Sequence, residues 1–205
     1  MTPTRAPQNE DDRLMRLIAK GETEALNQLM LSWQSRLYSF VWRNVRNREV
    51  AEELAQETFW RLWDARARYR PGGRFSAWLF QIASRLCIDH FRRVGARPQL
   101  VNDEDLPPAE ARSDDRPDRI VRACETQDAV DEAIANLPEN QRIALELIRF
   151  EGLTYREAAN AMQTTPGAVE QLVHRARKRL RQDLAQYMPE NARKSATSAK
   201  KAAEG

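Results

Sequence analysis

The stretch that decides the fold is Leu153–Leu180, LTYREAANAMQTTPGAVEQLVHRARKRL. Thr154 and Glu157 have the spacing of a capping box, in which the hydroxyl and the carboxylate each satisfy a backbone N–H group at the start of a helix. Thr165 followed by Pro166 marks a second helix start, because proline suits the first helical position. About two or three residues then remain for the turn, so the sequence predicts a helix-turn-helix.

The second helix of this motif has an apolar side and a polar side. Its apolar residues recur at a spacing of three or four and predict a buried stripe: Val169, Leu172, Val173, Ala176 and Leu180. The polar side then faces away from the core. Side chains near the start of such a helix can read base edges in the major groove, so Glu170 suits cytosine, Gln171 suits adenine and Arg175 suits guanine.

Further along the same helix the polar side chains are mainly cations. They suit sequence-independent contacts with phosphates: His174, Arg177, Lys178, Arg179 and Arg181. A second interpretation stays open, in which these cations only complement the negative end of the helix dipole and remain solvated.

Length and composition indicate a soluble protein of one or two domains, since 41% of the 205 residues are hydrophobic and 31% are charged. No apolar run approaches the ~20 residues that cross a bilayer, and Met1 to Asp12 is too polar and acidic for a signal peptide. We therefore expect a cytoplasmic protein. The net charge of +3 is too small to indicate nucleic-acid binding by itself, because local clusters of cations matter more.

Catalytic and metal chemistry have little support in the sequence. Cys87 and Cys124 are far apart and lack the paired spacing of a zinc site, so we expect buried or incidental thiols. The chain has two histidines, His90 and His174, and no glycine-rich phosphate loop. We expect neither an enzyme nor a bound cofactor or metal.

The fold class predicted from periodicity is all-α, with two small helical domains joined by an extended acidic linker. Apolar residues recur at helical spacing over residues 12–93, and again over residues 126–186, where four helices include the motif. Prolines and acidic residues dominate residues 94–125, which we expect to form the linker. The two ends, residues 1–11 and 187–205, are expected to be disordered tails.

Tryptophan and arginine alternate in the first predicted domain, and all five tryptophans precede residue 79. This mixture suits the stacking of unpaired bases while arginine screens their phosphates. Tyr69 and Phe75 flank the Pro71–Gly73 loop and are expected to be exposed for that purpose. For Trp60 and Trp63, a partner surface and core packing both remain open.

Two further surfaces stand out in this domain. The segment Ala51–Phe59, AEELAQETF, is acidic and apolar, and it fits either a protein-docking surface or a helix start whose acidic residues complement the dipole. The next predicted helix has a polar side that fits contact with DNA, although a solvated face explains the same charges: Gln81, Ser84, Arg85, Asp89, Arg92 and Arg93.

Together these segments resemble the bacterial sigma factors of the extracytoplasmic-function group in the sigma-70 family, over about residues 11–94 and 126–186. The resemblance implies a transcription initiation factor that binds core RNA polymerase and promoter DNA and is usually held by an anti-sigma factor. It also implies that the linker threads through the polymerase toward the RNA exit channel. The implied polymerase contacts are Glu53, Leu54, Gln56, Glu57 and Phe59.

The resemblance also implies two sets of DNA contacts. Those at the minus-10 element are Tyr69, Phe75, Ser84, Arg85 and Asp89. Those at the minus-35 element are Arg156, Thr165, Gly167, Glu170, Gln171, His174, Arg175, Arg177 and Lys178. The chain departs from the family pattern at four positions, so its promoter sequence does not follow from the resemblance: Glu53 for the frequent Asp, Arg85 for the frequent Asn, and Glu170 and Leu172 where cations are common.

Two other functions remain as alternatives. One is a helix-turn-helix regulator that binds duplex DNA without polymerase, which leaves the tryptophan-rich and arginine-rich domain unexplained. The other is a sigma-like decoy that only sequesters a regulatory protein, which has no use for the cations between Arg175 and Arg181.

Overall fold

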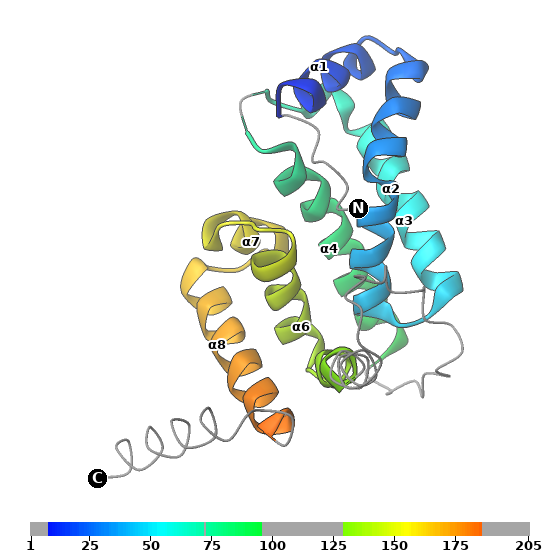
Figure 1. Cartoon of the computed structure of the whole chain (residues 1–205). Helices are drawn as coiled ribbons and strands as arrows, with labels where there is room; N and C mark the ends of the chain where they lie inside the picture. Colours follow the sequence, from blue (N-terminus) through cyan, green and yellow to red (C-terminus); the bar gives the residue numbers. More distant parts are fainter. Residues whose placement is uncertain (1–7, 72, 96–128, 186–205) are drawn as a thin grey trace, which may run out of the picture.

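The computed structural model describes residues 8–71, 73–95 and 129–185, and the regular elements in these ranges are helices (Figure 1). The predicted all-α class is confirmed. None of the helices in this part of the chain is long and apolar enough to span a membrane. The N-terminal half contains α1 Gln8–Ala19, α2 Thr23–Val45, α3 Arg48–Asp64, the short η1 Arg66–Arg68 and α4 Phe75–Val94.

Helix α1 begins earlier than the sequence analysis predicted. Residues 8–11 were expected to belong to a disordered tail, but they form the first turn of α1. The reason is a buried contact: the indole Nε1 of Trp33 donates a hydrogen bond of 2.9 Å to the Asp11 carboxylate. Residues 1–7 of the predicted tail lie outside the described residues.

A tight corner joins α2 to α3. Arg46 adopts a left-handed conformation with φ of 52°, and its N–H group donates to the carbonyl of Trp42 at 2.8 Å, which ends α2. Asn47 then caps α3, because its side-chain oxygen accepts from the N–H group of Val50 at 3.0 Å. Because only these two residues connect the helices, the chain reverses sharply and α3 packs alongside α2 (Figure 1).

An aromatic cluster fills the space between α2 and α4. The ring of Phe80 lies 5.1 Å from Phe40 and 6.3 Å from Trp33, and Trp33 lies 5.3 Å from Phe75. All three phenylalanine rings are fully buried. Tilted and edge-to-face pairs of this kind add to the hydrophobic gain from burial, so the cluster holds α2 and α4 in a fixed relation.

The described part of the C-terminal half consists of several short helices and the longer α8. Residues 129–135 are helical, and the chain continues through α6 Glu139–Leu145, the π-helical turn η3 Glu146–Phe150, α7 Tyr155–Met162 and α8 Pro166–Asp183. The buried Arg142 guanidinium donates to the carbonyls of Ala135 and Leu137, which ties α6 to the preceding helix. Residues 96–128 and 186–205, with most of the predicted linker and the predicted C-terminal tail, lie outside the described residues.

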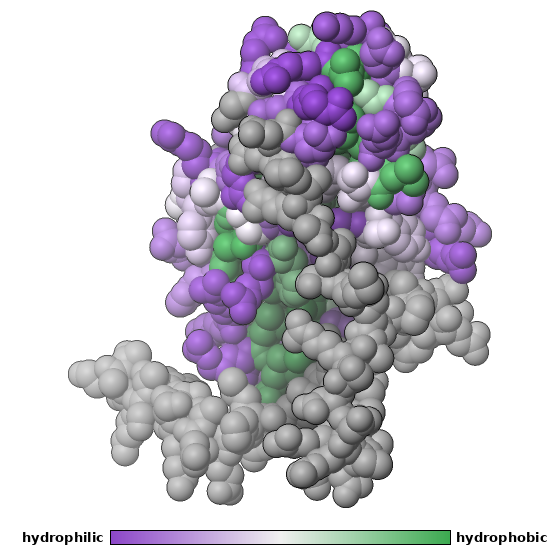
Figure 2. All heavy atoms as spheres, turned by 45° about the horizontal axis from the view of Figure 1, so that its top comes forward, coloured by the Kyte–Doolittle hydropathy of each residue, from purple (hydrophilic) through white to green (hydrophobic). Residues whose placement is uncertain are grey.

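The two halves pack against each other, which the sequence analysis did not predict. Helix α7 lies along α4, and α6 also contacts α2 and α4 (Figure 1). The surface at the α1 end of the molecule is mainly hydrophilic (Figure 2). Among the described residues, the large apolar side chains that remain exposed come from separate elements: Leu31, Trp60, Val94, Phe150 and Tyr155.

Replacing Phe80 by alanine is expected to destabilise the protein by about 3–5 kcal/mol, because it leaves a cavity between Trp33 and Phe40. Guanidinium chloride unfolding followed by far-UV circular dichroism measures this loss. Trp60→Ala is the matched control, since Trp60 is 62% exposed and its truncation should change stability by less than about 0.5 kcal/mol. A loss at Phe80 no larger than at Trp60 would contradict the assigned core.

Candidate nucleic-acid interface

The helix-turn-helix forms as its capping residues predict. The Thr154 hydroxyl oxygen accepts from the N–H group of Glu157 at 3.2 Å, and the Glu157 carboxylate accepts from the N–H group of Thr154 at 2.7 Å. At the second start, the Thr165 hydroxyl oxygen accepts from the N–H group of Ala168 at 3.2 Å, and Pro166 opens α8. Both predicted helix starts are confirmed.

The turn between α7 and α8 spans residues 163–165. Gln163 has a φ of 54°, and the N–H group of Thr164 donates to the carbonyl of Ala159 at 2.9 Å, so the end of α7 is closed by backbone bonds. Small residues let the two helices approach closely, since Ala158 and Ala161 are fully buried. The turn and the packing together fix the direction of α8.

Helix α8 presents its polar side to solvent. Val169, Val173 and Ala176 are fully buried or nearly so, and the predicted apolar stripe is confirmed. Every residue predicted to contact the minus-35 element has an exposed side chain or backbone: Arg156, Thr165, Gly167, Glu170, Gln171, His174, Arg175, Arg177 and Lys178. Their DNA contacts stay a prediction.

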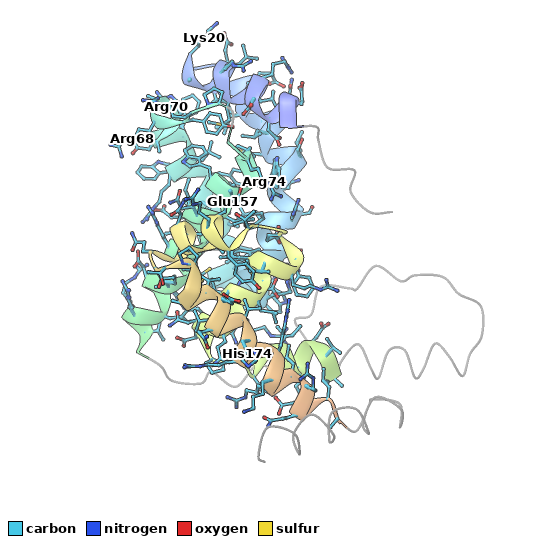
Figure 3. All side chains as sticks on the ribbon, turned by 90° about the vertical axis from the view of Figure 1, so that its left-hand side faces the viewer. Lys20, Arg68, Arg70, Arg74, Glu157 and His174 are labelled. Atoms are coloured by element: carbon cyan, nitrogen blue, oxygen red, sulfur yellow. The ribbon has the colours of Figure 1, made fainter. Side chains whose placement is uncertain are left out.

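Three cations of α8 are exposed and suitably placed to meet phosphate: Arg175, Arg177 and Lys178. Among the described residues no carboxylate pairs with Arg175, Arg177 or Lys178, and the ion pair on this helix is a 4.0 Å contact between Arg179 and Asp183. His174 marks this surface in Figure 3. Unpaired cations on one face of a helix produce the local positive field that attracts a nucleic-acid backbone.

The predicted exposure of Tyr69 and Phe75 is wrong. Tyr69 is 9% exposed, its hydroxyl donates to the Asp12 carboxylate, and its ring lies 5.1 Å from Trp78. Burial raises the pKa of Tyr69 above its ordinary value, with the bond to Asp12 as the second cause. Phe75 is fully buried beside Trp33. Both rings fill the space where α1, η1 and α4 meet, so neither is available to stack on a base in this structure.

Ser84 is also wrongly predicted as a surface contact. It is fully buried on α4, and its hydroxyl donates to the carbonyl of Phe80 at 2.6 Å. Arg85 and Asp89 are partly exposed on the same helix. The cations near the loop that stay at the surface are Arg68 and Arg70, which Figure 3 shows toward the same end of the molecule as Lys20.

Helix α3 separates the predicted docking residues into two groups. Glu53 and Gln56 are exposed, and Glu57 is partly exposed and accepts from Arg61 at 2.8 Å. Leu54 and Phe59 are buried in the core, so their predicted direct contact with a partner is wrong for this structure.

The exposed face of α3 also includes Trp60, for which the sequence left open a partner surface or core packing. Trp60 lies three or four residues after Glu57 and Gln56 and therefore on the same helix face. It is exposed, whereas Trp63 is partly buried, with the Arg66 guanidinium 4.2 Å from its ring centroid. The surface formed by Glu53, Gln56, Glu57 and Trp60 is called the α3 face below.

A buried ion-pair cluster joins the two halves, and the sequence analysis missed it. Arg43 of α2 donates from Nε to Glu146 at 2.6 Å, and Arg36 of the same helix donates from Nε to Glu151, also at 2.6 Å. Arg43 Nη2 lies 3.6 Å from the other Glu151 oxygen. The sequence feature that could have indicated this cluster is Glu146, an acidic residue between two leucines, Leu145 and Leu147, that are both buried.

The π-helical turn explains how two glutamates five residues apart meet the same helix. The N–H group of Glu151 donates to the carbonyl of Glu146 at 3.0 Å, which stacks residue i+5 over residue i. Arg36 and Arg43 are seven residues apart, about two turns of α2, and so share one face. The local irregularity therefore aligns two carboxylates with two guanidinium groups.

Burial dominates the electrostatics of this cluster. Glu146 is fully buried, and burial raises its pKa to about 7 despite the opposing charges of Arg43 and Arg142 and with a further contribution from Glu151. The pKa of Glu151 is raised for the same reason, against Arg36 and Arg43.

The free cysteine in the described part of the chain is Cys87, which is buried. Burial raises the pKa of the Cys87 thiol to about 12, which keeps it protonated and unreactive near neutral pH. Across residues 8–71, 73–95 and 129–185, no three His, Cys, Asp or Glu side chains come together in a way that could hold a metal ion.

Comparison with known proteins gives two family matches. The sigma-70 region 2 family matches residues 29–97, and the sigma-70 region 4 family matches residues 127–180. The chain is 30% identical to the RNA polymerase sigma-H factor of Pseudomonas aeruginosa over 179 residues, covering 83% of this chain and 91% of the relative. It is 33% identical to the ECF RNA polymerase sigma factor SigE of Mycolicibacterium smegmatis, and this match covers 85% of this chain and 68% of the relative.

The fold is similar to that of the sigma factor RpoE of Bartonella quintana, whose structure was solved in complex with the anti-sigma factor NepR. The TM-score is 0.62 at 25% sequence identity, and the match covers 78% of this chain and 96% of that one.

Glu146→Gln is expected to reduce the pH dependence of stability. The folded state binds the Glu146 proton up to about pH 7, whereas the ordinary glutamate pKa is 4.5. The folded state therefore holds more protons in that window, and this residue makes the free energy of unfolding fall as pH rises through it. Urea unfolding of wild type and variant at several pH values between 4.5 and 7 measures the slope. Parallel curves would contradict the raised pKa.

Proposed function

The chain belongs to the extracytoplasmic-function sigma factors of the sigma-70 family, and we propose that its helices divide the work of promoter recognition among three surfaces. As a member of this family it is a transcription initiation factor that works with core RNA polymerase at promoter DNA. The observation that carries the proposal is the exposed polar side of α8 on a capped helix-turn-helix, where Arg175, Arg177 and Lys178 have no carboxylate partner among the described residues.

The first surface is α8, which is assigned to the minus-35 element. Glu170 and Gln171 lie in the first half of the helix and Arg175 lies one turn after Gln171, where side chains reach base edges in the major groove. Arg177 and Lys178 follow as phosphate contacts that hold the helix in register. Because caps and small buried residues hold α7 and α8 together, the helix that carries these side chains keeps a fixed direction.

The second surface is the exposed part of α4 together with the arginines that precede it, and it is assigned to the melted minus-10 strand. Arg85 and Asp89 lie on α4, and Arg68 and Arg70 lie near the loop that leads into it. Unstacking a base costs a few kcal/mol, so a surface that helps melting has to offer stacking or charge in return. The buried Tyr69 and Phe75 support this surface from the core.

The third surface is the α3 face, which is assigned to core RNA polymerase. It combines the exposed Trp60 with the carboxylates Glu53 and Glu57. An exposed tryptophan beside charged side chains is typical of protein interfaces, where aromatic residues contribute much of the affinity. Acidic side chains are also unsuited to face DNA phosphates. The negative charge of the α3 face therefore distinguishes it from the two surfaces assigned to DNA, which carry arginines.

The remaining parts of the proposal follow from family membership. The Bartonella quintana relative forms a complex with the anti-sigma factor NepR, and we assign to this chain an anti-sigma partner of its own. We further assign its action to the cytoplasm and a role in initiation that involves no catalysis by the chain itself.

Reconstituted transcription tests the proposal. Core polymerase without a sigma subunit, supplied with the purified chain and fragments of the host genome, is expected to produce run-off RNA from a limited set of start sites. A regulator that acts without polymerase, or a decoy, would give none. Absence of RNA from every fragment would reject the function.

Arg175→Ala is expected to lower initiation about 10-fold to 100-fold at promoters that depend on the upstream element, because a bidentate base contact contributes about 1–3 kcal/mol. The same purified holoenzymes, assayed on those promoters and on random duplex DNA, provide the comparison. Arg181→Ala is the matched control, since Arg181 is exposed in the last turn of the same helix. Equal losses on promoter and random DNA would identify Arg175 as a phosphate contact instead.

A further inference from the structure

Two buried carboxylates of α1 hold this helix against the rest of the N-terminal half. Asp11 accepts a hydrogen bond from the indole of Trp33 in α2, and Asp12 accepts one from the hydroxyl of Tyr69, which follows η1. These bonds fix α1 beside η1, which it also contacts along the chain. Because both carboxylates are buried, they add little negative charge to the outer surface of α1.

The outer side of α1 carries cations. Arg16 and Lys20 are exposed and lie one helical turn apart on the same side of the helix, separated by about 6 Å along its axis. Across the described ranges neither pairs with a carboxylate, whereas Arg13 of the same helix is bound to Glu10 at 2.6 Å. The last two turns of α1 therefore carry unpaired positive charge.

Two arginines of the neighbouring segment extend this charge. Arg68 at the end of η1 and Arg70 just after it are exposed, and in the part of the chain that the structure describes neither pairs with a carboxylate. Burial raises the pKa of the Tyr69 hydroxyl and the charge of Arg16 opposes that rise, so Arg16 lies within electrostatic reach of the residue between these arginines. The four cations are called the α1–η1 patch below: Arg16, Lys20, Arg68 and Arg70.

The α1–η1 patch lies at the end of the N-terminal half where α4 begins. Helix α1 crosses this end of the bundle and contacts both η1 and α4 (Figure 1). Figure 3 shows Lys20, Arg68 and Arg70 toward this same end of the molecule. Their side chains reach solvent without any helix of the C-terminal half in front of them in that view.

The chain order gives this end a direction along the promoter. The helix-turn-helix unit, assigned to the minus-35 element, follows α4 in the chain, beyond Val94. The Val94 end of α4 is therefore the end that faces upstream DNA under the proposed function. The Phe75 end, next to the patch, then faces the DNA downstream of the minus-10 element.

We propose that the α1–η1 patch binds the phosphates of the melted DNA strand between the minus-10 element and the transcription start. This inference rests on the proposed function, and it adds Arg16 and Lys20 to the residues that hold the strand. The aromatic rings at this end, Tyr69 and Phe75, are buried, so the patch offers charge without stacking and its contact is independent of base sequence. Phosphates held beyond the melted element keep that strand from pairing again.

Two fork templates test the proposal. Both are built on a start site found in the run-off assay, and both contain the upstream duplex and the single strand of the minus-10 element. In the short template this strand ends after the element, whereas in the long template it continues to the start site. Fluorescence polarisation of the labelled templates, titrated with core polymerase carrying the purified chain, measures how much the extension raises affinity.

The double variant Arg16→Gln/Lys20→Gln is expected to bind the short template as wild type does and to lose about 10-fold of the affinity that the extension adds at ~0.1 M salt. Each phosphate contact on a single strand contributes about 0.7 to the slope of log affinity against log salt, so the slope for the long template is expected to fall by about 1.4. Both positions are exposed, and far-UV circular dichroism checks that the helices are retained.

The matched control is Arg177→Gln/Lys178→Gln, which removes the same two residue types from the exposed side of α8. These residues are assigned to the upstream element that both templates contain. The control is therefore expected to change affinity for both templates by the same factor and to keep the full effect of the extension. A general effect of net charge would instead reduce the effect of the extension in both double variants.

Two results would overturn the inference. One is an extension that raises affinity equally for wild type and Arg16→Gln/Lys20→Gln, and the other is an equal loss by this variant on both templates, which would place the patch against polymerase or upstream DNA. The proposed function fails differently. A wild-type holoenzyme that makes no RNA from any fragment rejects that function, whereas RNA synthesis together with either of the two results rejects the α1–η1 patch alone.

Discussion

The arrangement of the two halves depends on the need to pair two buried carboxylates. An ionised glutamate inside a protein is costly unless opposite charge and hydrogen bonds surround it. Glu146 and Glu151 accept their side-chain hydrogen bonds from arginines of α2, more than one hundred residues away in the chain. This pairing, together with the packing of α7 against α4, fixes the position of the helix-turn-helix relative to α2 and α4.

The ion pairs are one part of the contact between the halves. Buried hydrophobic residues of both halves belong to a single core cluster, so the packing of α6 and α7 against α2 and α4 also stabilises the arrangement. The raised pKa of Glu146 shows that burial outweighs the attraction of the arginines at this residue. The ion pairs therefore specify the geometry of the contact more than they add to its free energy.

Aromatic residues in the N-terminal half serve the fold more than the surface. Trp33, Phe40, Phe75 and Phe80 form one cluster, and Tyr69 extends it toward α1 through its bond to Asp12. The rings near the loop that leads into α4 are thereby removed from solvent, and arginines supply its exposed side chains. Trp60 is the exception on α3, where it stays exposed beside Glu57.

The sequence by itself determined the local structure. The caps at Thr154 and Thr165, the apolar stripe of α8 and the all-α class depend on contacts between residues a few positions apart, which spacing reveals directly. Only the tertiary structure decided which polar and aromatic residues are buried. Tyr69, Phe75, Ser84, Leu54 and Phe59 were assigned to surfaces because spacing shows which residues share a helix side, but not which neighbouring helix covers that side. The pairing of Arg36 and Arg43 with Glu151 and Glu146 was hidden for the same reason, since it joins distant segments and needs a π-helical turn that no periodic pattern encodes.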